Sequence, residues 1–193
     1  NPLAEMYAEA LRYAVGQNSA TAGFTGGNDL TGLPKPAWQD PYRLPEQGGN
    51  SYCAACNILV MSSSLPSFDG NAIPDVPQEI GNGNSLTDLI GSYEGLNGEL
   101  LVGSATQDTN TAHEQLCSAK NVTALGSARG ICPDTPSTEG SYRLAGLAYG
   151  ARITDLRPGL QGKPATHRNT VTTYAVALAD NLPKFEVPVG GGR

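Results

Sequence analysis

Residues 57–62 read NILVMS, an unbroken apolar run of strand length. An unbroken run, in place of strict alternation, is typical of a parallel strand that is covered on both faces. The segment that follows, residues 63–77 (SSLPSFDGNAIPDVP), is polar and rich in turn residues. Open α/β sheets place their sites beyond the carboxyl ends of such strands, so we expect any site of this protein in that loop.

Apolar residues recur at helical spacing on both sides of this strand, in residues 2–15 and 137–154. This spacing predicts an amphipathic helix over residues 2–15 and a second helix, packed on the sheet, over residues 137–154. Ser85 and Asp88 form a variant of the capping box ahead of a further apolar pattern. They predict a third, short helix over residues 86–94.

Two acids share one face of the first helix. Glu5 and Glu9 are four residues apart, and Glu9 also meets Arg12 at a spacing of three. Because such pairs usually lie on solvated helix surfaces, we expect both acids to be exposed.

A second core strand is predicted near the end of the sequence. Residues 171–179 (VTTYAVALA) are rich in β-branched and apolar residues and follow a turn-rich loop. A short strand is also expected at residues 99–102. Strands that alternate with helices indicate the α/β class, in which helices flank a mostly parallel sheet.

The composition fits one domain with long loops. The 193 residues include 24 Gly and 14 Pro, so the core must be concentrated in a few segments. We expect core segments at residues 1–16, 56–63, 85–94, 137–157 and 170–180, and insertions at residues 17–52 and 97–136.

The acidic balance argues against two classes of partner. With a net charge of −6 and a pI near 4.8, the chain has no basic patch for nucleic acid or an anionic membrane. No stretch approaches the roughly 20 consecutive apolar residues of a membrane span. The chain starts at Asn1-Pro2, typical of the cap and first position of a helix, so we expect a fragment whose export information lies upstream.

Four cysteines, Cys53, Cys56, Cys117 and Cys132, indicate an oxidising compartment and two disulfides. Three pairings are open. Sequence proximity favours Cys117 with Cys132, which leaves Cys53 with Cys56. The Cys53–Cys56 pair precedes its strand, whereas thioredoxin-type pairs follow a strand at a helix N-terminus, so a structural bridge is favoured over redox chemistry.

Four blocks of the sequence together resemble the PilC/PilY family of type IV pilus tip-associated proteins. They are residues 1–16 (NPLAEMYAEALRYAVG), 52–74 (YCAACNILVMSSSLPSFDGNAIP), 128–158 (ARGICPDTPSTEGSYRLAGLAYGARITDLRP) and 171–189 (VTTYAVALADNLPKFEVPV). The blocks follow the order of the family. No block resembles the propeller that forms the C-terminal part of family members.

In that family an N-terminal region resembles a von Willebrand factor A domain, and the propeller carries a calcium-binding loop. The resemblance implies that residues 1–193 are part of one von Willebrand A-like, Rossmann-like sheet with flanking helices, incomplete because its first strand lies upstream of Asn1. It also implies an exported protein at the cell surface or pilus tip, or in the periplasm or outer membrane. The implied partners are pilins or minor pilins, a host or surface ligand, and the rest of the same polypeptide.

The resemblance also bears on metal binding. The adhesion site of von Willebrand A domains uses a DxSxS loop, a Thr and an Asp, whose oxygen atoms suit Mg²⁺ or Ca²⁺. In this sequence DxSxS does not occur, the Thr position falls at Asn1 and the Asp position falls at Ser63. Ser62, Ser63 and Asp69 are the residues left to ligate an ion at this degenerate site. Otherwise we expect no cofactor within this chain.

These observations favour a non-enzymatic module that acts in pilus biogenesis and in adhesion to a surface or host. Contacts are expected from the loops at residues 17–52 and 64–84, which leave the rim of the sheet. Two alternatives stay open. One is a thiol-redox or metal-dependent enzyme fragment whose catalytic half lies upstream, and the other is an architectural filament subunit whose sheet another chain completes.

Overall fold

The computed structural model describes most of the chain. The described residues are 1–24, 37–63, 65–70, 72–73, 76, 80–106, 116–132 and 139–178. Their main elements are α1 (Leu3–Ala14), β1 (Cys56–Ser62), α2 (Gly83–Tyr93), β2 (Gly98–Ser104), β3 (Ser118–Val122), β4 (Arg129–Ile131), α3 (Arg143–Ile153) and β5 (Val171–Ala177). Short 3-10 helices are η1 (Ala22–Phe24), η2 (Pro45–Gln47) and η4 (Leu125–Ser127).

The described strands form two separate sheets. β1 and β5 pair in parallel, in register from Cys56 opposite Val171 to Ser62 opposite Ala177. β2 pairs antiparallel with β3 on one side and with β4 on the other. The predicted α/β character is confirmed at this level, as a mixture of helices with one parallel and one antiparallel sheet.

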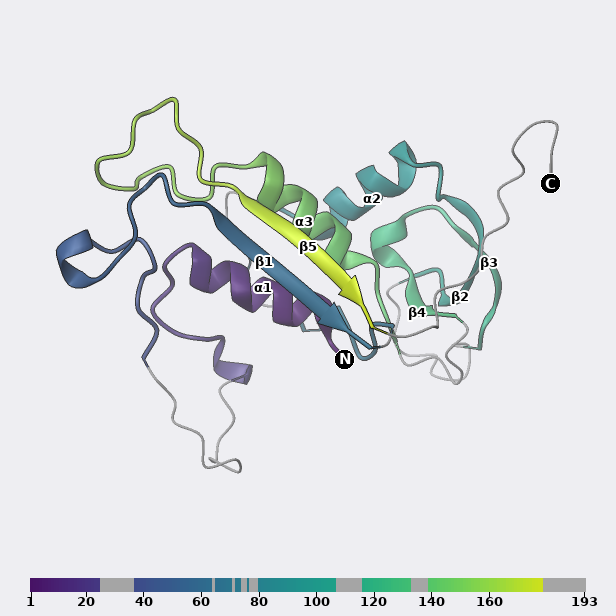
Figure 1. The fold of residues 1–193 in the computed structure, drawn as a ribbon. Helices are drawn as coiled ribbons and strands as arrows, with labels where there is room; N and C mark the ends of the chain where they lie inside the picture. Colours follow the sequence, from purple (N-terminus) through teal and green to yellow (C-terminus); the bar gives the residue numbers. More distant parts are fainter. Residues whose placement is uncertain are drawn as a thin grey trace, which may run out of the picture.

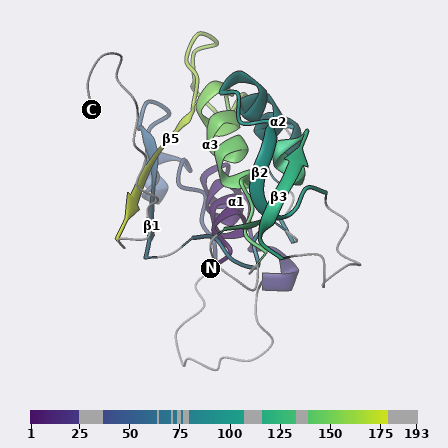
Figure 2. The same cartoon turned by 90° about the vertical axis from the view of Figure 1, so that its right-hand side faces the viewer.

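The parallel sheet has helices on one face. In Figure 1, α1 and α3 lie behind β1 and β5, and no described helix or strand lies in front of them. The turned view separates the layers, with β1 and β5 on one side, α1 and α3 in the middle, and α2 with β2 and β3 beyond them (Figure 2). The start of α1 lies at the carboxyl ends of the two parallel strands (Figure 1).

The main core lies between the helices and the inner side of the parallel sheet. Leu11 of α1, Leu147 of α3 and Val171 of β5 are almost fully buried there, and Ile58 and Val60 of β1 pack against them. Full burial of a side chain of this size contributes about 1.5–3 kcal/mol. These apolar contacts therefore fix how α1 and α3 sit on the sheet.

The first helix forms where its apolar spacing predicts it. α1 spans Leu3–Ala14, within the expected range, and Gly16 follows it with a φ of 81°. This left-handed conformation is common just after a helix, and glycine adopts it without steric cost.

The second helix is capped differently from the prediction. The side chain of Asn82 accepts a hydrogen bond from Asn84 N at 2.9 Å. Asp88 Oδ1 instead accepts one from Gly126 N at 2.7 Å. The Ser85–Asp88 capping box is therefore wrong, because Asp88 ties α2 to the turn before β4 and not to its own first turn.

The third helix starts at Arg143, later than expected, and residues 137 and 138 of the expected range lie outside the described part of the chain. α3 packs closely against α2 because it carries Gly146. A Cβ at this position would overlap Thr87 Oγ1 and the carbonyl oxygen of Gly83. The close approach of the two helices thus depends on the absence of a side chain at one position.

The antiparallel sheet lies within residues 97–136, where the sequence indicates only an insertion with one short strand. β2 contains that strand, and β3 and β4 join it on either side. Val102 and Val122 are fully buried in a small apolar cluster of their own. Among the described helices, none has both the length and the apolar character needed to cross a membrane.

Candidate functional site

The carboxyl ends of β1 and β5 meet the start of α1, where the sequence pattern places a site. Asn1 Nδ2 donates a hydrogen bond to Ser62 Oγ at 2.7 Å, and Leu178 N donates to Ser62 O at 2.8 Å. Ser63, the next residue, is exposed. The structure thus brings Asn1 against the strand end that carries Ser62 and Ser63.

Asp69 follows in the same loop, but it is buried. Only 1% of its surface is exposed. Its Oδ1 accepts a hydrogen bond from Ala4 N at 2.6 Å, in the first turn of α1, and its Oδ2 accepts one from Ser141 Oγ at 2.9 Å, just ahead of α3. Asp69 therefore joins the starts of two helices.

Glu5 is the second buried acid of this region, so the expectation that it is exposed is wrong. Its Oε1 accepts hydrogen bonds from Gly70 N at 2.6 Å and from Ala72 N at 3.2 Å. It also shares a hydrogen bond with the Asp69 carboxyl group. Two carboxyl groups bond to each other only when one of them carries a proton.

The proton belongs on Asp69. Burial, and then the hydrogen bond with Glu5, raise the pKa of Asp69 to about 7. Burial alone would raise the pKa of Glu5 as well, but hydrogen bonds from Asp69, Ala72 and Gly70 outweigh it and hold that pKa below its usual value. Glu5 is therefore the ionised member of the pair.

Two buried arginines complete the region. Arg129 Nη2 of β4 donates to Gly70 O at 2.9 Å, and Arg143 Nη1 of α3 donates to the same oxygen. Burial, and then the charge of Arg129, lower the pKa of Arg143 to about 10, so it stays charged at neutral pH. We call Glu5, Asp69, Arg129 and Arg143 the charge cluster; it connects α1, the loop after β1, β4 and α3.

The residues expected to ligate a metal ion do not form an open ion site in this structure. Ser62 already accepts a hydrogen bond, Ser63 is exposed, and both carboxyl oxygens of Asp69 are enclosed and accept from protein donors. Arg129 and Arg143 lie against the same loop, and their charges disfavour a further cation. In the described part of the chain no group of three or more His, Cys, Asp or Glu side chains is placed to hold a metal. Metal binding at Ser62, Ser63 and Asp69 stays a prediction.

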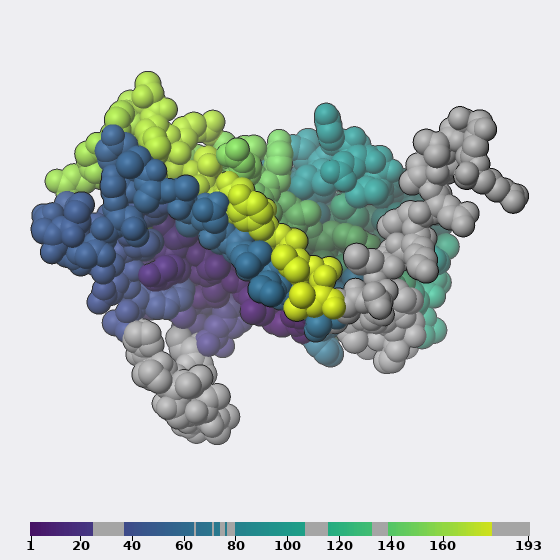
Figure 3. Space-filling view, viewed as in Figure 1, coloured from purple at the N-terminus to yellow at the C-terminus, as the bar shows by residue number. Residues whose placement is uncertain are grey.

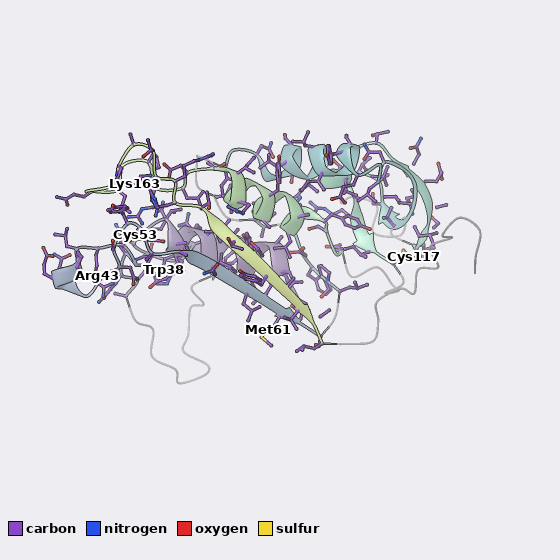
Figure 4. The ribbon with its side chains drawn as sticks, turned by 45° about the horizontal axis from the view of Figure 1, so that its top comes forward. Trp38, Arg43, Cys53, Met61, Cys117 and Lys163 are labelled. Carbon is purple, nitrogen blue, oxygen red and sulfur yellow. A yellow bond between two sulfur atoms is a disulfide. The ribbon has the colours of Figure 1, made fainter. Side chains whose placement is uncertain are left out.

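The cysteines form one bridge and one pair of free thiols. Cys117 and Cys132 are disulfide-bonded, with their Cα atoms 5.9 Å apart. Cys53 is exposed and Cys56 half-buried, and the bridge that the sequence favours between them is not formed here. Figure 4 shows Cys53 and Cys117 at opposite ends of the molecule, so neither cysteine of one pair can form a disulfide with a cysteine of the other in this fold.

A cavity of about 930 Å³ lies near the end of α1, among the loops before β1 and after α3. Arg157 lines it, donating to the Asp40 carboxylate at 2.9 and 2.6 Å and lying over the ring of Tyr42. The bond from Arg157 holds the pKa of Asp40 below its usual value. Sequence reasoning missed this cavity because its lining comes from irregular loops that carry no periodic signal.

The outer side of the parallel sheet is apolar and exposed. Leu59 of β1 lies opposite Tyr174 of β5, and Met61 lies opposite Val176. These four side chains, which we call the outer face, are 58, 56, 57 and 41% exposed respectively. The two strands reach the surface in the space-filling view, and Met61 points away from the helices (Figures 3 and 4).

The outer face lacks the cover that parallel strands normally have. No described helix or strand lies on it, and within the described residues neither β1 nor β5 pairs with a third strand. Parallel sheets occur almost only with both faces covered, and a lone pair of strands is marginally stable. Exposed apolar patches are one of the features by which contact surfaces are recognised.

Comparison with known proteins identifies the family. Residues 1–151 match the family model described as the second domain of PilY1 homologs. The chain belongs to this family. The match ends within α3, so β5 lies beyond the residues that the family model covers.

The family assignment agrees with a longer relative. The chain is 32% identical over 213 aligned residues to the type IV pilus biogenesis factor PilY1 homolog of Xylella fastidiosa. That alignment takes in all of this chain but only 14% of the relative. No solved structure matches the chain. The resemblance to the PilC/PilY family is thus confirmed, and the chain corresponds to a small part of its PilY1 relative.

Proposed function

We propose that the chain is a non-enzymatic module of an exported protein that acts in type IV pilus biogenesis and in attachment to a surface or host. The membership of the PilY1 homolog family and the printed name of the relative support the pilus role. The Cys117–Cys132 disulfide fits an oxidising, extracytoplasmic location. The observation that carries the proposal is the outer face, an apolar surface that suits docking and not catalysis.

The fold proposed for the complete domain is a von Willebrand A-like, Rossmann-like sheet. α1, β1, α3 and β5 are its described part, with helices on the inner face only. We assign the cover of the outer face to a segment of the same polypeptide outside residues 1–193, since the relative is far longer than this chain. The contact of Asn1 with Ser62 supports this fold, because Asn1 and the neighbouring Ser63 are the positions that correspond to adhesion-site ligands.

Partners are proposed on the same basis. The loops at residues 17–52 and 64–84 flank β1 in the sequence and are proposed to contact pilins, minor pilins or a surface ligand. Many of their described residues are polar and exposed, whereas Asp69 and Ile80 are buried and are not part of the proposed contact surface.

An enzyme is the weaker candidate. Burial raises the pKa of the Cys56 thiol, which is the opposite of the activation that a catalytic thiol needs. The charge cluster is closed to solvent and its carboxyl groups are engaged with each other and with backbone donors. The charge cluster therefore offers no reacting atom to a substrate, and the Cys56 thiol is not activated.

The test replaces the outer face in the full-length protein. Leu59→Ser combined with Tyr174→Ser is expected to reduce surface pili and attachment several-fold, because the segment that covers the sheet loses its apolar contact. Tyr93→Ser is the matched control, since Tyr93 is 91% exposed and lies on α2. Normal piliation and attachment by the double variant, at normal protein levels, would contradict the proposal.

A second measurement identifies what covers the face. A cysteine placed by Met61→Cys, in a full-length protein whose free Cys53 and Cys56 are replaced by Ser, is reacted with a cross-linker that has one thiol-reactive end and one photoreactive end. A cross-link within one polypeptide supports the covering segment proposed here. A cross-link between two polypeptides would instead favour the architectural filament subunit, whose sheet another chain completes.

A further inference from the structure

The two free thiols lie together at the amino-terminal end of β1, away from the charge cluster. Cys53 belongs to a turn in which Ala54 N donates to Ser51 O at 2.9 Å, and its Sγ lies 3.2 Å from Ser51 Oγ. Cys56 is the first residue of β1 and pairs with Val171. The exposed thiol therefore sits on a surface turn, and the half-buried one is anchored in the sheet.

Both cysteines line one small pocket. It has a volume of about 170 Å³, and residues 167–170 and Thr172 form its other wall. The pocket walls are held together because Asn169 Nδ2 donates to Tyr52 O at 2.7 Å and the His167 ring packs edge-on against Tyr52. Two thiols thus share a space that opens toward solvent on the side of Cys53.

No other cysteine is within reach of this pair. Cys117 and Cys132 are already bonded to each other, and Figure 4 places Cys117 at the far end of the molecule from Cys53. Disulfide formation by Cys53 or Cys56 must therefore join them to each other or to a thiol from outside the chain.

We propose that Cys53 and Cys56 are an exchangeable dithiol, a site at which a low-molecular-weight disulfide oxidises the folded protein to a Cys53–Cys56 bridge. The Cys53 thiolate attacks one sulfur of the external disulfide, forming a mixed disulfide and releasing one thiolate. Cys56 then gives its proton to solvent, and its thiolate attacks Cys53 Sγ, forming the internal bridge and releasing the second thiolate. The external disulfide gains the two electrons that the cysteine pair loses.

The order of the two steps follows from burial. Cys53 is exposed, so an external disulfide reaches it first. Burial raises the pKa of the Cys56 thiol, so Cys56 keeps its proton and reacts only with the adjacent mixed disulfide. The pair is thus an acceptor of exchange and not a catalyst of it, which separates this site from the enzyme alternative.

The bridge has a structural consequence. It closes the short segment between the turn at Ser51 and the first residue of β1, beside the contact of Asn169 with Tyr52. The amino-terminal end of the parallel sheet and the loop before β5 become fixed to each other through β1. The Cys117–Cys132 bridge has no part in this, because it lies in the segment of the antiparallel sheet.

The test uses the full chain with its Cys117–Cys132 bridge intact. The protein is equilibrated with mixtures of reduced and oxidised glutathione, the thiols are trapped with a maleimide, and the products are mapped by mass spectrometry. We expect Cys53 and Cys56 to disappear together, with an internal bridge as the product and glutathione bound to neither. Persistence of two free thiols, or of a stable glutathione adduct on the wild-type protein, in the most oxidising mixture would overturn the proposal.

Two single variants test the roles. Cys56→Ser is expected to stop at a glutathione adduct on Cys53, and Cys53→Ser is expected to react with oxidised glutathione about tenfold more slowly than the wild type, or slower still. Equal rates for Cys53→Ser and wild type would overturn the assignment of Cys53 as the entry point. Circular dichroism of each variant checks that the fold is kept, and piliation does not enter the readout, so this result stands apart from the proposed pilus function.

Discussion

Raising the pH is expected to destabilise the folded protein through Asp69. Its pKa is about 7 in the fold, against an ordinary value of 3.8. Between these values the unfolded chain has released this proton while the folded chain keeps it, so the contribution of Asp69 is fully present below pH 3.8 and is lost as the pH rises through about 7. Ionisation leaves two buried carboxylates, Glu5 and Asp69, against each other.

The size of the effect follows from the pKa. Each pH unit below the folded pKa corresponds to about 1.4 kcal/mol, so a rise from about pH 5 to about pH 8 should lower the free energy of unfolding by about 3 kcal/mol. Glu5 does not contribute in this interval. Its pKa is lowered, so its stabilisation is present above the ordinary value of 4.5 and is lost only as the pH falls below it.

Asp69→Asn isolates the contribution. Asparagine has nearly the shape of the protonated acid and keeps an oxygen that accepts from Ala4 N. Its amide has no proton to lose, and it cannot accept from Ser141 Oγ, so only the pH slope and not the absolute stability is compared. Urea unfolding followed by circular dichroism across this pH range should show a stability that falls for the wild type and stays level for the variant. The two histidines of the chain are present in both proteins and cancel in the comparison.

Two results would refute this reasoning. One is a wild type as stable at about pH 8 as at about pH 5, and the other is an Asp69→Asn protein that keeps the wild-type slope. Glu46→Gln serves as the control for a general charge effect, because Glu46 is exposed on η2. It should keep the wild-type slope.

Three further predictions concern the free energy of unfolding. Leu147→Ala empties a site that is 1% exposed and should lower the free energy of unfolding by about 2–5 kcal/mol in urea titrations. Gly146→Ala forces a methyl group into α2 and should lower it by about 1–3 kcal/mol, whereas Gly159→Ala, with open space around it, should be nearly neutral in the same assay. Replacing Cys117 and Cys132 by Ser removes a bridge across a sequence separation of 15 and should lower the free energy of unfolding by about 3 kcal/mol. Equal stability of the double variant and the wild type would contradict this.

The parallel strands and the helices were predictable because their signal is local. A core strand is predicted from local sequence alone in two segments, the apolar run at residues 57–62 and the β-branched segment at residues 171–179. The structure places them side by side as β1 and β5, with α1 and α3 on one face. Residues 179 and beyond lie outside the described part of the chain.

The antiparallel sheet was not predictable in the same way. β3 reads SAKNV, which has neither a strong alternation nor a high β-propensity. It is held by distant partners: it pairs with β2, and Lys120 Nζ donates to Val102 O at 3.0 Å and to Leu116 O at 2.9 Å. Contacts of this kind override local propensity, and sequence spacing does not reveal them.

The charge cluster was not predictable from the sequence either. Glu9 and Arg12 form the expected ion pair, with Glu9 Oε1 and Arg12 Nε 3.2 Å apart, but each side chain is only 16% exposed, so the expectation that Glu9 is exposed is wrong as well. The helical spacing predicts that Glu5 is exposed as well. Instead, the loop after β1 covers Glu5 and supplies the Gly70 and Ala72 donors. A spacing rule describes one helix, whereas burial of Glu5 depends on a loop some 65 residues away.

The unbroken apolar run of β1 is typical of a strand that is covered on both faces, but the described elements cover only one of them. Its alternate residues face opposite sides, so the inner side is satisfied by α1 and α3, while the outer face leaves about half of each of its four side chains exposed. Covering that remaining surface would contribute roughly 3–6 kcal/mol. A typical domain has a net stability of only about 5–15 kcal/mol. A gain of that size is large beside this net stability, so the proposed cover of the outer face is expected to be a permanent part of the folded protein and not an occasional partner.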